Sequence, residues 1–345
     1  MIDNEKIKVS ICVITYNQEK YIEECIDSLL RQQADFDFEI VIGDDSSTDN
    51  TSKICKEYQL KYPEIIRYHY NETNLGILNN FTNTLLRARG EYLAICAGDD
   101  YWIDDYKLQK QVYFLENNPE YSLCCTNWKN YYEENNIIES DRASCEIKGN
   151  LQDYFISRNI EKILLENMPG LKPSTFCFRK NIFIKEYEKD KFLFTNLKFP
   201  SEDLQLVLLL IDNGKFHFIN EDMLVYRVVV SSASNSNNAK KRATLALGVF
   251  SIKLYLLRRY GLSQKTQDIM CRNALGGLLP YAYKEHDAGF VNEICEVLKD
   301  YSYNLRMSHR LLILGSRNVF FYWLLKPLFI ITEIYNIWKK CIKNN

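Results

Sequence analysis

The sequence predicts an α/β protein with a mostly parallel, Rossmann-like sheet flanked by helices and a helical C-terminal extension. Strands and helices alternate through the first hundred residues, and the strands are short apolar runs rich in β-branched residues. From residue 240 onward the pattern is helical throughout. Alternation with short connections is typical of parallel sheets with right-handed crossovers.

The first element is a strand over residues 8–15, whose β-branched composition suits a strand covered on both faces. The helix expected over 19–33 places Ile22, Ile26, Leu29 and Leu30 on one face. The elements that follow are strand 38–42, helix 52–61, strand 65–70, helix 77–88 and strand 92–97.

After residue 105 the alternation becomes less regular. The expected elements are helix 107–117, strand 121–126, an exposed irregular excursion over 131–150, strand 174–179, helix 204–213 and strand 215–220. The polar stretch 231–238 is typical of a domain boundary. We therefore expect a catalytic domain over 1–235 and a helical region over 240–345.

The net charge of −2 hides two regions of opposite charge. Residues 1–239 carry 26 Lys and Arg against 38 Asp and Glu, whereas residues 240–345 carry 17 against 7. The acidic part argues against nucleic acid as a partner, because nucleic-acid binding draws on clustered basic residues. The basic part suits an anionic lipid surface.

The chain has 11 cysteines, with no Cys-x-x-Cys pair and no zinc-site spacing. These features predict buried free thiols in a reducing compartment. The polar N-terminus leads directly into the first strand, so we expect no signal peptide and a cytoplasmic location.

Two adjacent carboxylates, Asp99 and Asp100, follow the apolar strand 92–97. Open α/β sheets bind ligands beyond the carboxyl ends of their strands. Neighbouring acids repel one another unless a cation or hydrogen-bond donors offset the charge. A divalent ion held with a phosphate-bearing substrate is one explanation, and capping of a helix that begins near Asp104 or Asp105 is the other.

Two more acidic pairs, Asp44-Asp45 and Glu202-Asp203, lie at or near the ends of predicted elements. Asp45 could cap the helix at residue 52 or close an Asx turn, and Glu202-Asp203 could complement a helix dipole. However, the pairs at 44–45 and 99–100 follow strands of the same predicted sheet, which capping does not require.

Several motifs in the same order resemble glycosyltransferase family 2, which has the GT-A fold. They are residues 9–17 (VSICVITYN), 21–32 (YIEECIDSLLRQ), 39–51 (EIVIGDDSSTDNT), 74–76 (NLG), 90–93 (GEYL) and 98–102 (GDDYW). The resemblance covers residues 7–230 and rests on the motifs as an ensemble.

This resemblance implies roles for the matching residues. Thr15, Tyr16, Asn17, Asp45 and Asp99 would bind the nucleotide, and Asp99 and Asp100 would hold Mg²⁺ or Mn²⁺ against the diphosphate. Asp203 would be the catalytic base, next to Glu202. Ser174, Thr175 and Glu202 would lie on the acceptor side. Trp102, just past the acid pair, could stack on a sugar there or could be a packing group.

The implied activity is a metal-dependent, inverting transfer of a sugar from a nucleotide sugar, UDP-linked in most relatives, to a glycan or lipid-linked acceptor in surface polysaccharide biosynthesis. Two alternatives stay open: a degenerate nucleotide-sugar-binding protein and a nucleotidyltransferase. The chain departs from the family where Ala97 replaces an acid and where residues 228–230 lack a histidine.

Residues 319–338 are apolar and aromatic and are flanked by basic residues, but Lys326, Pro327 and Glu333 interrupt them. This pattern suits a helix lying in a membrane interface, at the inner face of the cell membrane. A helix packed on the catalytic domain fits equally, and a membrane-spanning helix fits least.

Overall fold

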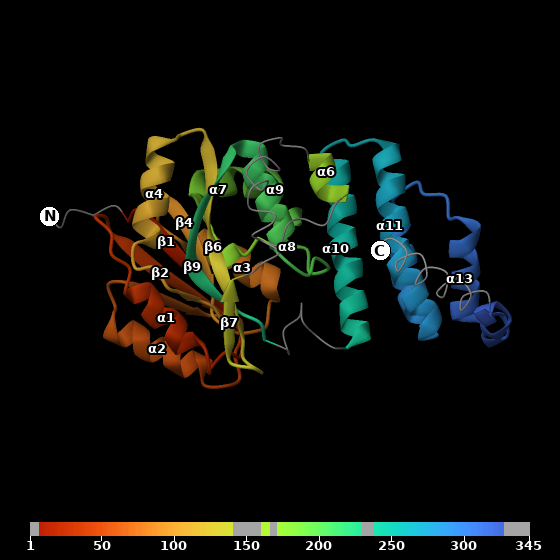
Figure 1. Ribbon diagram of the computed structural model, residues 1–345, viewed down its shortest axis with the longest axis horizontal. Coiled ribbons are helices and arrows are strands. Elements are labelled where there is room, and N and C mark those ends of the chain that lie inside the picture. The colour runs from red at the N-terminus through yellow and green to blue at the C-terminus, as the bar shows by residue number, and fades with distance from the viewer. Residues whose placement is uncertain (1–6, 141–159, 166–170, 230–237, 328–345) are drawn as a thin grey trace. The chain divides into compact units, whose positions relative to one another are not determined.

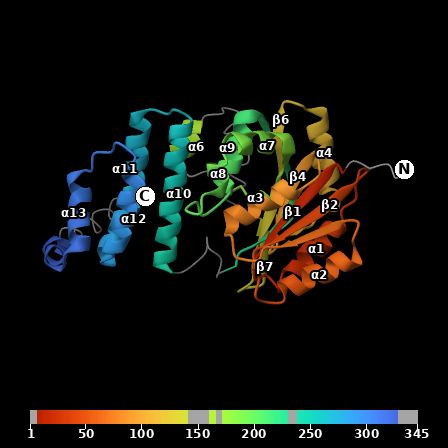
Figure 2. The same cartoon turned by 180° about the vertical axis from the view of Figure 1, so that it is seen from behind.

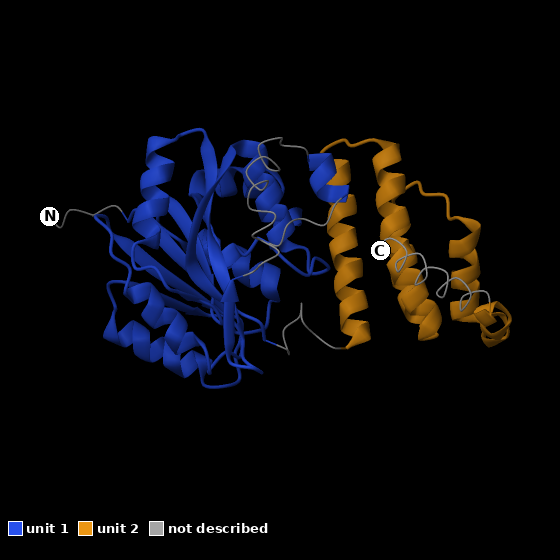
Figure 3. Ribbon diagram, in the orientation of Figure 1, with its two compact units in different colours: residues 1–237 blue, residues 238–345 orange. Residues whose placement is uncertain are grey.

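The computed structural model describes residues 7–140, 160–165, 171–229 and 238–327. The chain divides into two units, Met1–Asn237 and Asn238–Asn345 (Figure 3). The first unit is built on a mixed sheet flanked by helices, and the described part of the second is helical. The predicted α/β class is therefore confirmed.

The parallel half of the sheet has the strand order β3-β2-β1-β4 (Figure 1). Its strands are β1 (Val9–Thr15), β2 (Phe38–Asp44), β3 (Ile66–Tyr70) and β4 (Tyr92–Ala97). In the register of β1 with its neighbours, Thr15 lies opposite Asp44 and Ile14 opposite Ala97. The carboxyl ends of three strands thus reach the same edge of the sheet.

The other half continues in the order β8-β6-β9-β5, with β7 paired to β6. Its strands are β5 (Tyr101–Trp102), β6 (Tyr121–Tyr132), β7 (Ile137–Ser140), β8 (Cys177–Arg179) and β9 (Lys215–Arg227). The long strands β6 and β9 pair in parallel, while β8 is antiparallel to both β4 and β6.

Three predictions for this half were wrong in extent. Strands β6 and β9 run six and seven residues beyond the expected ends at 126 and 220, because they pair with each other along most of their length. The expected irregular excursion begins instead with the β6–β7 hairpin, and residues 141–150 lie outside the described residues. The expected strand 174–179 begins with a 3₁₀ turn, Pro173–Thr175.

Among its described residues, the first unit contains the helices α1 (Ile22–Leu30), α2 (Thr51–Lys61), α3 (Ile77–Arg87), α4 (Lys107–Asn117), α6 (Ile160–Leu165), α7 (Lys180–Lys189), α8 (Phe192–Thr195) and α9 (Asp203–Asn213). Of these, α1, α2, α3, α4 and α9 pack on strands of the sheet. Helices α1 and α2 lie side by side in both views (Figures 1 and 2). As predicted, α1 buries Ile22, Ile26 and Leu29, and Leu30 packs partly against the same core.

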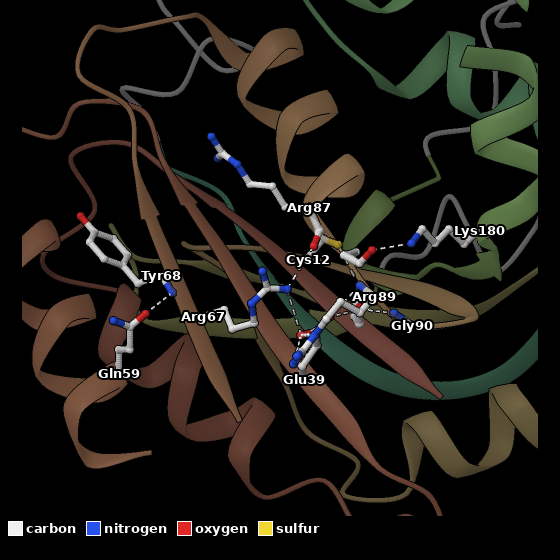
Figure 4. Close-up of polar contacts among 11 residues, drawn as sticks. Cys12, Glu39, Gln59, Arg67, Tyr68, Arg87, Arg89, Gly90 and Lys180 are labelled. Atoms are coloured by element: carbon white, nitrogen blue, oxygen red, sulfur yellow. Dashed lines mark hydrogen bonds and ion pairs between the residues drawn. The ribbon is translucent and has the colours of Figure 1, made fainter. Parts of the chain in front are cut away.

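A buried carboxylate links the amino ends of the central strands (Figure 4). Glu39 is fully buried and accepts hydrogen bonds from Ser10 Oγ at 2.7 Å, Arg89 N at 2.7 Å and Arg89 Nε at 2.8 Å. Arg67 Nη1 lies 3.3 Å from Glu39 Oε2. Burial by itself would raise the pKa of Glu39, but these hydrogen bonds outweigh it and hold the pKa below its usual range.

The cysteines of the described residues are free thiols. Eight of these nine cysteines are buried and Cys295 is partly exposed. Most of them lie in apolar surroundings, where burial raises the pKa of thiols such as Cys12 and keeps them unreactive.

The second unit contains α10 (Ala239–Arg259), α11 (Gln264–Lys284), α12 (Ala288–Leu298) and α13 (Met307–Arg317), and residues 319–327 are also helical. Asn238, Ser263 and Asp287 cap the first three helices, because each side chain accepts a backbone N–H of the first turn. Across the described ranges, none of the helices is both long and apolar enough to span a membrane. Residues 328–338 of the predicted interface segment lie outside the described residues.

Candidate functional site

A cavity of about 690 Å³ opens at the carboxyl edge of the parallel strands. The loop that follows β1 forms one wall, and the segments after β2 and β4 supply Asp45 and Asp99. Further lining residues are Asp49, Asn74, Gly76, Ile77, Asn80, Ala97, Glu202 and Val229. The shared end of three strands therefore creates the pocket that the sheet topology predicts.

The β1 loop places Thr15, Tyr16 and Asn17 on the cavity wall, as the sequence predicts. Asn17 has a positive φ of 52°, and its conformation is fixed by hydrogen bonds to the segment that follows β2. Its backbone N donates to Ser47 Oγ at 2.9 Å, and its Oδ1 accepts from Thr48 N at 2.8 Å. These hydrogen bonds join the loop after β1 to the segment after β2 at the edge of the cavity.

Asp44 and Asp45 have different tasks. Asp44 is fully buried and accepts from Ser47 N at 3.0 Å and Tyr68 Oη at 2.7 Å, so it stabilises the turn. Asp45 accepts from Leu75 N at 2.8 Å and Gly76 N at 2.9 Å. The alternative in which Asp45 caps the next helix is wrong, because Asn50 is the N-cap residue of α2 and Asp45 instead fixes the 74–76 loop.

The acid pair after β4 is divided between the cavity and the protein interior. Asp99 lines the cavity, whereas Asp100 is 2% exposed and does not line it. Asp100 Oδ2 accepts from Ser174 Oγ at 2.6 Å, and Oδ1 accepts from Arg227 N at 3.1 Å. The pair caps no helix, since α4 begins at Lys107 and Tyr106 is its N-cap residue.

Electrostatics at the acid pair favour a cation. Burial raises the pKa of Asp100 to about 8, and the neighbouring charge of Asp99 adds to this rise. Burial also raises the pKa of Asp99, although Arg227 and Gln18 oppose the effect. Two buried like charges are costly when both are ionised, and a bound cation would relieve that cost.

The donor set fits a hard divalent ion that completes its coordination with substrate oxygens. Among the described residues there is no cluster of three or more His, Cys, Asp or Glu side chains arranged to hold a metal. Asp99 and Asp100 could contribute carboxylates, and Mg²⁺ commonly binds one or two carboxylates together with substrate phosphates and water.

Three residues predicted for the acceptor side do not face the cavity. Trp102 is 1% exposed, and its Nε1 donates to Ser174 O at 3.0 Å. Ser174 and Thr175 are also buried, and Thr175 Oγ1 donates to Lys172 O at 2.7 Å. Their acceptor-side role stays a prediction, and in the structure the 3₁₀ turn packs against β4 while Ser174 holds Asp100.

Glu202 and Asp203 stand at the start of α9. Glu202 lines the cavity, while Asp203 is half-buried and is not among the lining residues. Burial raises the pKa of Asp203 to about 6, opposed by the Lys172 ammonium and a hydrogen bond with Glu202. Burial and the Asp203 charge raise the pKa of Glu202 well above its usual range. Burial therefore raises the pKa of both carboxyls, and the hydrogen bond between them links their ionisation.

Sequence reasoning assigned no role to two cationic residues of this site. Lys172 Nζ lies 3.6 Å from the centre of the Tyr226 ring, and its charge acts on both Asp100 and Asp203. Arg227 is 6% exposed and lies 5.0 Å from the ring centres of Tyr21 and Tyr101. The hydrogen bond from Arg227 N to Asp100 forms because β9 pairs with β5, the strand that follows the acid pair. The local sequence around Arg227 does not reveal that pairing.

The comparisons with known proteins agree with this geometry. The family model described as "Glycosyl transferase family 2" matches residues 10–186. An uncharacterized glycosyltransferase of Methanocaldococcus jannaschii is 31% identical over 227 residues, covering 65% of this chain and 72% of that protein. An uncharacterized protein of Mycobacterium tuberculosis is 46% identical over 126 residues. That match spans only 36% of this chain and 36% of the mycobacterial protein.

Among solved structures, a mannosyltransferase of Pyrobaculum calidifontis in complex with GDP-Man and Mn²⁺ superposes with a TM-score of 0.53. It is 15% identical, and the match covers 93% of this chain and 87% of that one. This likeness supports the fold. Because the family model matches just over half of its length, the chain belongs to glycosyltransferase family 2.

Proposed function

We propose that this chain transfers a sugar from a nucleotide sugar, UDP-linked, to a hydroxyl of a glycan or lipid-linked acceptor during surface polysaccharide synthesis. The proposal depends on one observation: a single cavity brings together the β1 loop, Asp45, Asp99 and Glu202 from distant parts of the chain. A site of this size suits a nucleotide sugar, since small-molecule sites commonly measure about 300–1,000 Å³.

Asp45 is the group proposed to recognise the base. A carboxylate offers about four acceptor positions. Leu75 N, Gly76 N and Asn71 Nδ2 occupy three of them, the last at 3.2 Å. About one acceptor position is left for a ligand N–H, which uracil can supply from its ring. These three hydrogen bonds hold the Asp45 carboxylate in place, so it could bind the base without first changing its orientation.

Asp99 and Asp100 are the residues proposed to hold Mn²⁺ or Mg²⁺. A bound divalent ion would stabilise the departing diphosphate as a Lewis acid. Asp99 faces the cavity, while Ser174 and Arg227 N hold the Asp100 carboxylate in a fixed orientation. Each Asp100 oxygen already accepts one hydrogen bond. Asp100 would therefore attract the ion through its negative charge, in addition to any direct bond that it makes.

Asp203 is the proposed general base, which would accept the proton of the acceptor hydroxyl as that oxygen attacks the anomeric carbon. A pKa of about 6 leaves the carboxylate ionised at neutral pH and strong enough as a base. The hydrogen bond from Glu202 lowers the pKa of Asp203 and so would favour the negative charge on Asp203. One base acting opposite the leaving group implies a single displacement with inversion.

The test is a thermal-shift screen of UDP-, GDP- and dTDP-linked sugars with and without Mn²⁺, followed by assays of donor hydrolysis and transfer. A ligand that binds the native state raises the melting temperature. We expect a shift with UDP-sugars that depends on Mn²⁺, and turnover of the same donor. Binding without hydrolysis or transfer would support the degenerate binding protein instead, and no shift with any nucleotide sugar would contradict the proposal.

A further inference from the structure

One side of the helix formed by residues 319–327 packs against other described residues of the second unit. Leu325 is buried, and Tyr322 packs on α11, with its ring 4.9 Å from that of Tyr283. The backbone O of Tyr322 also accepts from Tyr283 Oη at 2.8 Å. The side of this helix that carries Tyr322 and Leu325 therefore packs against the rest of the second unit.

The outer side of the same stretch is apolar and exposed. Val319, Phe320, Trp323 and Leu324 expose between 59% and 70% of their surface. A helix turns about 100° per residue, so these four positions fall within a sector of about 140°. Exposed apolar patches of this kind mark interaction surfaces, because soluble proteins rarely leave them uncovered.

Helix α13, which precedes this stretch, presents a face of mixed character. Met307 and Leu314 are exposed apolar residues, and Arg310 and Arg317 are exposed at positions three and ten residues after Met307. At about 100° per residue, these four positions share one side of the helix. The side is both apolar and basic.

The Arg and Lys residues of this region have no acidic residue among them in the sequence. Residues 306–327 carry Arg306, Arg310, Arg317 and Lys326 and no acidic residue. Lys326 Nζ lies 4.4 Å from the centre of the Trp323 ring, at the border of the exposed apolar side. Aromatic and aliphatic groups bordered by Lys and Arg are the pattern that suits the headgroup region of anionic bilayers.

We propose that the exposed apolar and basic side chains of these two helices, Met307, Arg310, Leu314 and Arg317 on α13 and Val319, Phe320, Trp323 and Leu324 after it, dock on the interface of an anionic lipid bilayer. The exposed apolar side chains of residues 319–327 lie along one side of the helix, so this helix would lie in the plane of the interface. A second copy of the chain fits the face less well, because two identical basic surfaces would oppose one another.

Vesicle flotation of the full-length chain tests the docking and does not depend on the proposed reaction. The probes are vesicles of phosphatidylcholine alone and of phosphatidylcholine with phosphatidylglycerol, at low and raised salt. We expect flotation with the anionic vesicles, weakened by salt. The double variant Phe320→Ser/Trp323→Ser should bind them at least about tenfold more weakly, because it removes two large apolar contacts.

The matched control is Leu60→Ser/Tyr113→Ser, which removes two exposed apolar side chains from the first unit and should float like the wild type. A second variant, Arg310→Glu/Arg317→Glu, keeps the apolar residues and should lose the preference for anionic vesicles. Circular dichroism establishes that each variant is folded. Equal flotation with neutral vesicles, or none with anionic ones, would overturn the proposal. So would a mass in sedimentation equilibrium that doubles for the wild type but not for Phe320→Ser/Trp323→Ser.

Discussion

Ser174 Oγ donates a 2.6 Å hydrogen bond to Asp100 Oδ2 in the buried wall behind the cavity. Ser174 Oγ also accepts from Ala97 N at 3.0 Å, so one hydroxyl joins the end of β4 to the acid pair. The 3₁₀ turn that carries Ser174 lies 74 residues beyond Asp100 in the chain. The orientation of the carboxylate thus depends on a segment that follows β7 in the chain.

Removing this hydroxyl should loosen Asp100. We expect Ser174→Ala to lower the free energy of unfolding by about 1–3 kcal/mol, since it leaves a buried carboxylate with one fewer donor. It should also weaken Mn²⁺-dependent nucleotide binding, measured by calorimetry. Ser122→Ala is the matched control, because Ser122 Oγ donates to the buried Leu210 O at 2.6 Å. An equal loss of nucleotide binding in both variants would contradict a specific role for Ser174.

The two members of the acid pair should differ in their effects. Asp99 faces the cavity, so Asp99→Asn should remove most Mn²⁺-dependent donor binding and leave stability nearly unchanged. Asp100→Ala should weaken that binding as well, but it should also alter stability because Asp100 is buried and hydrogen-bonded. Calorimetry with and without Mn²⁺, together with thermal melts, checks both. Mn²⁺-dependent binding that persists in both variants would exclude the pair as the metal site.

Asp203→Asn should abolish transfer while nucleotide-sugar binding persists, because the amide cannot accept the proton of the acceptor. The expected loss in kcat is about 10²–10⁴-fold, the range for a general base. Glu202→Gln keeps the size and the hydrogen-bonding capacity of the neighbour and should cost less. Near-normal turnover of Asp203→Asn would refute the assignment, and calorimetry with the donor establishes that the variant still binds it.

The transfer rate should fall on the acidic side of the pH profile. The pKa of Asp203 is raised to about 6, so lowering the pH through that value protonates the base and removes activity. The groups that act on this carboxyl are Glu202 and the Lys172 ammonium. Lys172→Met should therefore move the acidic limb of kcat to higher pH, and Lys172→Arg should restore it. An unshifted limb in Lys172→Met would show that Lys172 acts on structure alone.

Glu39 makes a pH-dependent contribution to stability at the opposite edge of the sheet. Its native pKa is lowered, so its contribution is complete above the unfolded value of about 4.3 and is lost as the pH falls through the native value. Glu39→Gln should reduce stability at pH 7 by about 1–3 kcal/mol and flatten the acidic part of the melting-temperature profile. Donor binding at pH 7 should be unchanged, which separates this network from the cavity.

The sequence predicted the parallel half of the sheet well because local signals decide it. Apolar β-branched runs of fitting length define β1, β2 and β4, and strand–helix alternation leaves few arrangements for them. Once the strands are parallel, the residues after them must meet at one edge. Thr15, Asn17, Asp45 and Asp99 could therefore be placed together from the sequence, and the structure has all four around one cavity.

The lengths of β6 and β9 could not be predicted in the same way. Their outer parts contain polar residues such as Asn127, Asn130 and Glu221, which have no strand pattern of their own. They are strands because each supplies hydrogen-bond partners to the other across roughly ninety residues of chain. The far end of β9 also pairs with β5, directly after the acid pair, and this pairing brings Arg227 N to Asp100.

By itself, the sequence determined the family motifs, the sheet edge on which they meet and the change to a basic helical region after residue 240. Only the tertiary structure decided that Trp102, Ser174 and Thr175 are buried. It also decided which acid of each pair lines the cavity: Asp99 and not Asp100, and Glu202 and not Asp203. The physical reason is the range of the interactions. Strand formation and edge position follow from local pattern, whereas burial and side-chain orientation depend on contacts between segments far apart in the chain.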